Sequence, residues 1–284
     1  MFRAGSAAAV LLGLVAYAVV HYESGGARAP HCTVAGREDG EPYTLQPQQA
    51  ANAATIEAVG SARELPERAV TIAIATAMQE SSLRNIDYGD RDSLGLFQQR
   101  PSMGWGSEEE IMDPVYASGK FYDHLVLVPD YLDMPLTEAA QEVQRSAFPD
   151  EYAKHEPDAA ALAAALTGRS AAALNCHPGT PPAAGDPEEI TSRLSREFGE
   201  AVAPLGGPAE VVVPVAPGNE RQGWELAHWA VAHSAELGIA RIDHAGMTWE
   251  ARRSSRGWQE TGGADAGDAR GTSAELRLTV ALAE

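Results

Sequence analysis

The stretch PERAVTIAIATAMQESSLRNIDYGDRDSLGLFQ, residues 66–98, decides the expected fold of this chain. Its first half contains no glycine, and its only proline, Pro66, stands where a first-turn proline belongs. These features predict a helix from Pro66 to about Ser82. The second half is dense in Gly, Asp and Ser, which predicts a long ordered loop. A helix with an apolar face is therefore followed directly by a loop of polar groups.

Glu80 lies near the end of this predicted helix, on the flank of its apolar stripe. At ~100° per residue, Val70, Ile74 and Met78 fall within one arc, whereas Gln79 points away from it. A carboxylate at the border of a buried face loses hydration, which raises its pKa. A general acid for a glycosidic bond must hold its proton near neutral pH. On helix geometry alone, Glu80 would still be an ordinary solvated or ion-paired residue.

Three sequence motifs in a fixed order indicate a functional role for Glu80. They are the pair Glu80-Ser81, the tetrad Gly95-Leu96-Phe97-Gln98, and the segment DPVYASGKFYDHL at residues 113–125. Together they resemble the family 1 lytic transglycosylases and the goose-type lysozymes. In that group a Glu-Ser pair ends the catalytic helix, and a Gly-Leu-Met-Gln-like turn faces it across the cleft. The resemblance covers about Leu65–Glu156 and implies a lysozyme-like fold.

The resemblance also implies a reaction. Glu80 would protonate the oxygen that joins N-acetylmuramic acid to N-acetylglucosamine in peptidoglycan. The same carboxyl group would then take a proton from the muramoyl 6-hydroxyl, which gives a 1,6-anhydro product, or from water. No cofactor and no metal is implied. The substrate-binding residues that it suggests are Ser81, Gly95, Leu96, Phe97, Gln98, Tyr122 and Gln144.

Two departures from the family pattern leave the product open. The group carries an Ala-Tyr-Asn-Ala-Gly stretch whose Tyr contacts the catalytic Glu, but residues 143–147 read VQRSA, which puts Gln144 at that position. The loop also contains Asp90 and Asp92. Either could be a second carboxylate that positions water, or an ordinary solvated turn residue. Tyr88, Phe97 and Trp105, in or near this loop, could stack on sugars, although core packing explains Phe97 equally well.

The N-terminus predicts export. Arg3 precedes an apolar run from Ala7 to Val20, which is shorter than the roughly 20 residues that span a bilayer. We therefore interpret residues 1–29 as a secretory signal with small-x-small cleavage sites at Ala16-Tyr17-Ala18 and Ala27-Arg28-Ala29. An uncleaved membrane anchor is the alternative. Both place the rest of the chain outside the cell or in the cell envelope.

Two cysteines, Cys32 and Cys176, bracket the helical region, and an even pair in an exported protein predicts a disulfide. We expect a linker at 30–47 and a lysozyme-like domain of about five helices at 48–176, with no convincing strand before Cys176. The expected helices are 48–63, 66–82, 108–126, 137–147 and 150–166. A second linker, rich in Pro and Gly, occupies 177–187.

Residues 188–284 predict a small α/β accessory module. It contains a helix at 190–198, a strand at 210–215, a helix at 224–237, a hairpin that turns at Ala245-Gly246, and a closing strand at 275–282. The expected fold class is therefore α+β, with an all-α domain first. We expect a binding or spacing role for the module.

The composition excludes some functions. With 21 basic and 40 acidic residues the net charge is −19, which excludes nucleic acid as a partner. His228 and His233 lack the spacing of four residues typical of helical zinc pairs. The leading hypothesis is an enzyme that cleaves peptidoglycan glycan strands. The alternatives are a non-catalytic cell-wall-binding protein and a surface interaction protein on a lysozyme-like scaffold.

Overall fold

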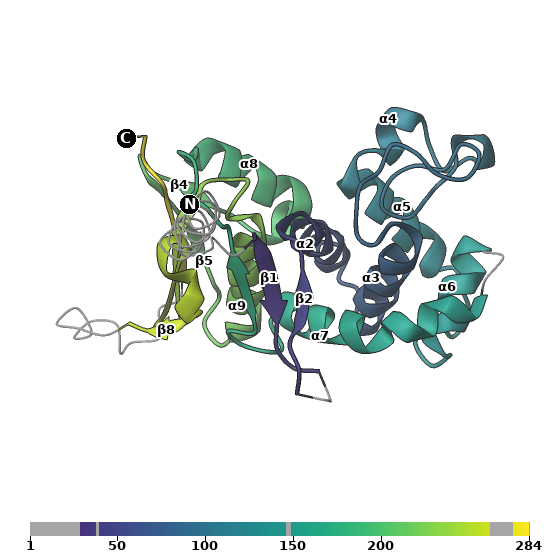
Figure 1. Ribbon diagram of the computed structural model, residues 1–284, viewed down its shortest axis with the longest axis horizontal. Coiled ribbons are helices and arrows are strands. Elements are labelled where there is room, and N and C mark those ends of the chain that lie inside the picture. The colour runs from purple at the N-terminus through teal and green to yellow at the C-terminus, as the bar shows by residue number, and fades with distance from the viewer. Residues whose placement is uncertain (1–28, 38–39, 146–148, 262–274, 284) are drawn as a thin grey trace, which may run out of the picture.

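The computed structural model describes residues 29–37, 40–145, 149–261 and 275–283 of the chain. This part is a mixed structure of helices and two antiparallel sheets, in agreement with the α+β class (Figure 1). The predicted signal or anchor lies outside the described residues. Within them, no helix has both the length and the apolar character that crossing a membrane requires.

The N-terminal part packs its helices around α3 (Glu67–Ser81), which contacts α2, α5, α6, α7 and the 3-10 helix η2. Its residues from Ala69 to Met78 are buried, and this is why the sequence there is small or β-branched. The prediction of one helix over 108–126 is wrong, because Asp113 caps a new helix that begins at Pro114. The elements around α3 are α2 (Pro47–Ser61), η1 (Pro101–Met103), α4 (Glu108–Ile111), α5 (Pro114–Leu125), α6 (Leu136–Gln144), η2 (Pro149–His155) and α7 (Glu156–Leu166).

A small sheet corrects the expected linker at 30–47. Strands β1 (His31–Val34) and β2 (Tyr43–Leu45) lie there and pair with β3 (Leu174–His177) in the order β2-β1-β3. The prediction of no strand before Cys176 is therefore wrong. Strands of three or four residues carry too little alternation to be recognised, and these exist through pairing with one another.

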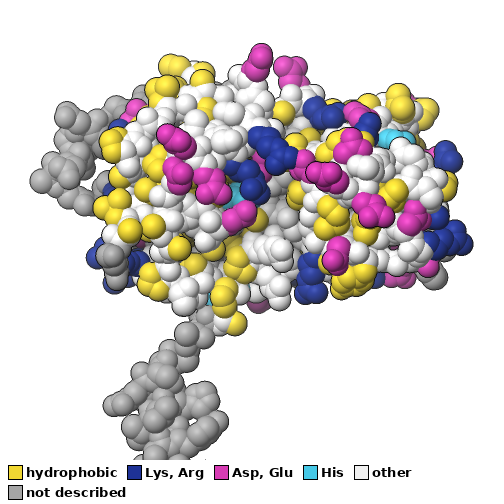
Figure 2. Space-filling model, turned by 90° about the horizontal axis from the view of Figure 1, so that it is seen from above, with side chains coloured by type: hydrophobic (Ala, Val, Ile, Leu, Met, Phe, Trp, Pro, Cys, Tyr) yellow, Lys and Arg dark blue, Asp and Glu magenta, His cyan; other side chains and the backbone are white. Residues whose placement is uncertain are grey.

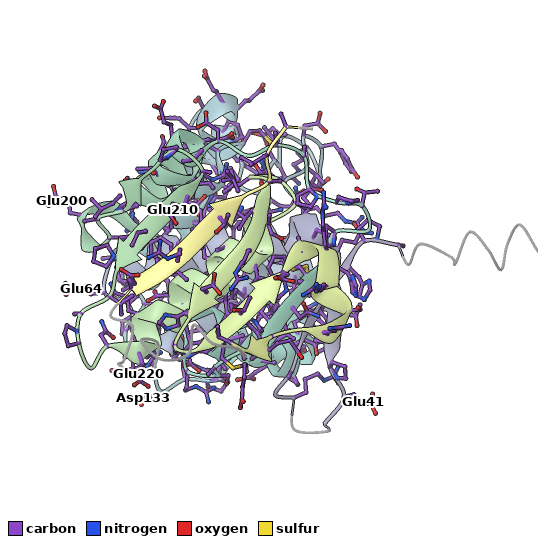
Figure 3. The ribbon with its side chains drawn as sticks, turned by 90° about the vertical axis from the view of Figure 1, so that its left-hand side faces the viewer. Glu41, Glu64, Asp133, Glu200, Glu210 and Glu220 are labelled. Carbon is purple, nitrogen blue, oxygen red and sulfur yellow. A yellow bond between two sulfur atoms is a disulfide. The ribbon has the colours of Figure 1, made fainter. Side chains whose placement is uncertain are left out.

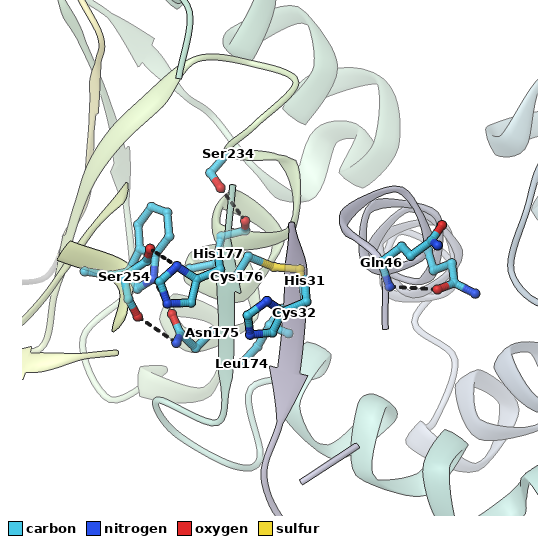
Figure 4. Close-up of a disulfide and its surroundings, with 12 residues drawn as sticks. His31, Cys32, Gln46, Leu174, Asn175, Cys176, His177, Ser234 and Ser254 are labelled. Atoms are coloured by element: carbon cyan, nitrogen blue, oxygen red, sulfur yellow. Dashed lines mark hydrogen bonds between the residues drawn. A yellow bond between two sulfur atoms is a disulfide. The ribbon is translucent and has the colours of Figure 1, made fainter. Parts of the chain in front are cut away.

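The predicted disulfide is confirmed. Cys32 and Cys176 stand directly opposite each other in the β1–β3 ladder and are bonded. Figure 4 shows the bond between the two strands, with Asn175 and His177 on either side of Cys176 hydrogen-bonded to Ser254 of the C-terminal part. The bond thus joins the start of the described chain to the end of the helical part.

The C-terminal part is a six-stranded antiparallel sheet with helices on one face. Its outer face, seen in Figure 3, carries ion pairs such as Arg277–Glu210 at 2.8 Å and Arg241–Asp243 at 2.7 Å. The predicted hairpin is confirmed, with Ala245 and Gly246 both at positive φ. Its elements are α8 (Pro187–Phe198), η3 (Gly199–Ala201), β4 (Leu205–Gly206), β5 (Glu210–Pro214), α9 (Glu220–His233), β6 (Ile239–His244), β7 (Met247–Glu250), η4 (Ala251–Arg256), β8 (Gln259–Glu260) and β9 (Glu275–Val280).

The two parts share one hydrophobic core, because α9 packs against α2, α7 and β3. Seen from above they form one continuous surface on which acidic and basic side chains are interspersed (Figure 2). At the contact, Glu57 of α2 is buried beside Glu225 of α9. Burial and the neighbouring Glu225 carboxyl raise the pKa of Glu57 well above its usual range, which favours the protonated form that donates a hydrogen bond to Glu225.

The predicted linker at 177–187 is not a free tether. Its Gly185 N–H donates to Ala281 O at 3.0 Å, and Ala281 N–H donates to Gly238 O at 2.8 Å. A Cβ on Gly185 would come within 2.5 Å of Leu237 O, so only glycine fits this close approach. The linker therefore packs along the end of the six-stranded sheet and helps to fix the two parts against each other.

Candidate functional site

Glu80 occupies the last turn of α3, two residues before the left-handed cap at Ser82. Residues 69–78 of the same helix are buried, while Glu80 itself is half-buried and lines a cleft. Burial raises the pKa of the Glu80 carboxyl, against the opposing effect of two hydrogen bonds from Tyr152 and Gln144. The raised pKa agrees with the flank position on the helix. Such a carboxyl group holds its proton closer to neutral pH than a solvated one.

Tyr152 is a partner of Glu80 that the sequence analysis missed. Its hydroxyl donates to Glu80 Oε1 at 2.6 Å, and its ring is fully buried in η2, which packs against α3. The sequence predicts one helix over 150–166, and the tyrosine of the family pattern was expected at 143–147, where Gln144 stands. The available signal was a tyrosine three residues after Pro149, near the start of that predicted helix.

Gln144, the last residue of α6, also contacts Glu80. Its Nε2 donates to Phe97 O at 2.8 Å, and its side chain hydrogen-bonds the Glu80 carboxyl. Gln144 therefore links the carboxyl group to the loop that faces it. Tyr152 and Gln144 come from different elements and approach the same carboxyl group, which fixes the orientation of Glu80.

The turn at 94–99 packs directly onto the end of α3. Leu94 and Gln99 exchange two backbone hydrogen bonds, at 2.9 and 3.0 Å, and close the turn. Ser81 Oγ, which is buried, donates to Leu96 O at 2.8 Å and accepts from Arg84 N–H at 3.2 Å. Ser81 thus joins the helix end to the turn, and its hydroxyl is already engaged within the protein.

Several residues that the resemblance suggested as substrate contacts are core residues in the structure. Leu96 and Phe97 are buried, and the Phe97 ring stacks on Phe121 at 4.7 Å. Tyr122 is fully buried and donates to Ile56 O at 3.0 Å. Since these side chains have no exposed surface, we do not carry them forward as substrate contacts.

Gly95 also has a structural explanation. Its φ is +75°, and a Cβ at this position would lie 2.7 Å from Ile111 O. The close approach that requires glycine here is made by the protein backbone. Gln98, in contrast, does line the cleft, with Nε2 near Tyr88 O and Gly95 O at 3.3 Å each.

The cleft has a volume of about 560 Å³. Its lining residues belong to α3, α5, α6 and the loop after α3, and these helices lie at the end of the molecule away from the six-stranded sheet (Figure 1). One side comes from the loop after α3 and from α5, and the other from the end of α6. The lining residues are Glu80, Asp90, Ser93, Gln98, Gln99, Arg100, Met103, Trp105, His124, Glu142, Val143, Gln144 and Arg145. Trp105 was suggested from the sequence as a residue that could stack on sugars, whereas Tyr88 is exposed and outside the lining. The lining residues that were not predicted are Ser93, Gln99, Arg100, Met103, His124, Glu142, Val143 and Arg145.

The two loop aspartates differ in their surroundings. Asp92 accepts hydrogen bonds from Arg100 Nε at 2.7 Å and from Ser102 N–H at 2.8 Å, and these bonds hold its pKa well below the usual range. Asp92 is therefore ionised, and its hydrogen bonds stabilise the loop. Asp90 lines the cleft, but its side chain is 93% exposed and its nearest ion-pair partner is Arg91 at 3.9 Å.

Comparison with models of known protein families and with curated proteins gives no match for this chain. The function must therefore be argued from the site itself. The disulfide adds that the protein belongs in an oxidising, extracellular environment.

Proposed function

We propose that the protein cleaves the glycan strands of peptidoglycan, with Glu80 as the general acid. The observation that carries this proposal is the position of Glu80. A half-buried carboxyl group with a raised pKa opens into a cleft, and Tyr152 and Gln144 orient it from two sides. Carboxyl groups tuned in this way serve as proton donors in glycosidases. The resemblance of residues 65–156 to the lytic transglycosylase group supplies the substrate class.

The reaction begins with protonated Glu80. Its proton passes to the oxygen between N-acetylmuramic acid and N-acetylglucosamine as the bond from that oxygen to the muramoyl C1 breaks. The positive charge at C1 is stabilised by the acetamido carbonyl of the same sugar. Glu80 is now a carboxylate, which the Tyr152 hydroxyl stabilises by donating to it.

The second step favours the muramoyl 6-hydroxyl as nucleophile. The Glu80 carboxylate takes the hydroxyl proton, and the oxygen bonds to C1, which gives the 1,6-anhydro product. Hydrolysis by inversion would need a second carboxylate that holds a water. Asp92 is occupied by Arg100 and Ser102, and Asp90 is almost fully exposed, so neither is oriented for that role.

We further propose that the chain is exported by its N-terminal segment and acts in the cell envelope. The apolar run of residues 7–20 and the disulfide both support this location.

The substitution Glu80→Gln tests catalysis. Wild-type protein should release soluble fragments from purified sacculi, and Glu80→Gln should release at least about a thousandfold less. Glu138→Gln is a matched control, since Glu138 is an exposed carboxylate on α6 that does not line the cleft. If Glu80→Gln and wild type are equally active, the catalytic assignment is wrong. If wild type binds sacculi but releases nothing, the protein is a binding module.

A further inference from the structure

Trp105 and His124 form a stacked pair in the wall of the cleft. Their ring centroids are 4.2 Å apart, the planes are inclined by 25°, and both residues line the cleft. Burial lowers the pKa of His124, so the imidazole is neutral at neutral pH and stacks as an uncharged ring. The imidazole therefore fixes the indole at the cleft wall. Aromatic rings held in this way present a flat apolar surface to a ligand.

Gln99 contributes a polar group to the same cleft. Its side chain is only 2% exposed, and its Nε2 donates to Ala117 O at 3.0 Å, which fixes the amide orientation. No group among the described residues donates to its Oε1. A buried acceptor without a partner is costly unless a ligand or water supplies a donor. Gln99 is among the residues that line the cleft, so a ligand bound there would lie next to this amide.

The aromatic pair and the free acceptor are both anchored on α5. Gln99 is attached at Ala117, and Trp105 stacks on His124, seven residues further along. Seven residues are two helical turns, so the two anchors lie on one face of α5 at ~10 Å axial separation. An extended ligand that follows this face would meet an apolar platform and a hydrogen-bond acceptor in turn.

We infer that Trp105, fixed by His124, and Gln99 Oε1 form a binding subsite for a glycan of N-acetylated hexosamines. The apolar face of one pyranose ring stacks on the Trp105 indole. An acetamido N–H of the glycan donates to Gln99 Oε1. The inference rests on the proposed function for its substrate class, and it assigns the binding specificity to residues that are separate from Glu80.

The test measures binding of chitotetraose, a soluble chain of four N-acetylglucosamine units, by calorimetry. The parent protein carries Glu80→Gln so that the probe is not consumed. Trp105→Ala should raise Kd by about tenfold or more, because the stacking surface is lost. Tyr88→Ala is the matched control: it removes a ring that is 69% exposed and outside the cleft, and its Kd should equal that of the parent.

His124 acts through Trp105 and is a positioning residue. His124→Ala should weaken binding, and His124→Phe, which keeps a neutral ring under the indole, should restore it. If Trp105→Ala binds chitotetraose as tightly as the parent, the Trp105 indole is not the surface on which the sugar stacks. If His124→Ala binds as tightly as the parent, or His124→Phe does not restore binding, the positioning role is wrong.

The Gln99 contact has its own readout, since Gln99→Met also loses the Ala117 bond and could fail to fold. The side-chain amide resonances of Gln99 should shift on chitotetraose addition more than those of Gln259, whose amide donates to Arg256 O at 2.6 Å in the C-terminal part and does not line the cleft. No shift would overturn the acceptor role.

The failure of this inference and of the proposed function can be told apart. If the wild-type protein cleaves sacculi but Trp105→Ala does not change the Kd for chitotetraose, only the role of Trp105 in sugar stacking is refuted. Binding that depends on Trp105 without cleavage by wild type would refute the proposed catalysis alone. A parent that does not bind chitotetraose would overturn the subsite, whatever its activity on sacculi.

Discussion

Glu80 is set apart from the other acidic residues of the chain by its immediate neighbours. Partial burial favours its neutral form, while the Tyr152 hydroxyl and the Gln144 amide favour its ionised form. Burial is the larger of these effects, so the pKa is raised. A carboxyl group balanced in this way can release and regain a proton in one catalytic cycle.

Removing the Tyr152 hydroxyl should change this balance in a known direction. In Tyr152→Phe the ionised form of Glu80 loses a hydrogen bond at 2.6 Å, so its pKa rises further. Because the first step needs protonated Glu80, the alkaline limb of the pH profile of kcat/KM should move to higher pH. We also expect the maximal rate to fall by about tenfold, since the carboxylate formed in the first step is less stabilised.

The matched control for this prediction is Tyr116→Phe, because Tyr116 lies outside the cleft. Its pH profile should coincide with that of wild type. An alkaline limb of Tyr152→Phe that stays in place, or moves to lower pH, would contradict the assigned role of the hydrogen bond.

At the scale of elements, the site depends on how the turn at 94–99 fits between α3 and α4. Substitutions at Gly95 and Gly104 can measure how much the packing of this turn contributes to stability. Both glycines have positive φ, but they differ in what a side chain would meet. A Cβ on Gly95 would lie 2.7 Å from Ile111 O, whereas a Cβ on Gly104 would meet nothing within 4 Å. Gly104→Ala therefore measures only the free-energy cost of placing an alanine at positive φ.

Gly104→Ala should lower the free energy of unfolding by about 1 kcal/mol, and Gly95→Ala by roughly 2–4 kcal/mol. Urea unfolding at neutral pH gives both values. Gly95→Ala should also reduce glycan cleavage, since the displaced turn carries the Phe97 carbonyl that holds Gln144. Equal destabilisation by the two substitutions would show that the packing against Ile111 does not matter.

At the scale of the whole molecule, the two parts are joined through buried polar contacts as well as apolar ones. His228 of α9 is fully buried, with Nδ1 at 2.6 Å from Ala165 O and Nε2 at 3.2 Å from Ala173 N. Nδ1 therefore carries the proton and donates, while Nε2 accepts. Burial lowers the pKa of His228 to about 4.

The lowered pKa of His228 predicts that the contact between the helical part and the C-terminal part is less stable at acid pH. Between the ordinary His pKa of about 6.5 and the folded pKa of about 4, the unfolded chain binds the proton and the folded chain does not. His228 thus stabilises the fold above pH 6.5 and loses this contribution, about 3 kcal/mol, as the pH falls to 4.

His228→Gln keeps a donor and an acceptor but does not titrate, so it provides the comparison. Thermal unfolding at pH 7 and pH 4.5 should show a larger loss of stability for wild type than for His228→Gln. If wild type and His228→Gln lose the same stability between pH 7 and pH 4.5, the protonation of His228 does not destabilise the contact between the two parts.

The sequence predicted the helices α2, α3 and α6, the hairpin of β6 and β7, and the closing strand β9. It also predicted the cysteine pair. It did not predict β1 and β2, because β1 pairs with β3, which is distant in the sequence, and β2 pairs only with β1. It also placed the C-terminal part beyond a free linker, whereas packing of α9 against α2 gives one core.

The site was predictable only in part, for a related reason. Glu80 and Gln98 were predicted from short motifs that resemble a known family, and both line the cleft. Tyr152, Gln99 and the Trp105–His124 pair reach the cleft through tertiary packing. Conversely, Phe97 and Tyr122 match a family pattern but fill the core.

The most direct test of the account is mass spectrometry of the muropeptides that the purified wild-type protein releases from sacculi. We predict fragments that end in 1,6-anhydro-N-acetylmuramic acid, each lighter by one water than the corresponding reducing-end fragment, and none from Glu80→Gln. Reducing-end fragments alone would contradict the proposed second step. Release of the same fragments by Glu80→Gln would contradict the central claim that Glu80 is the catalytic acid.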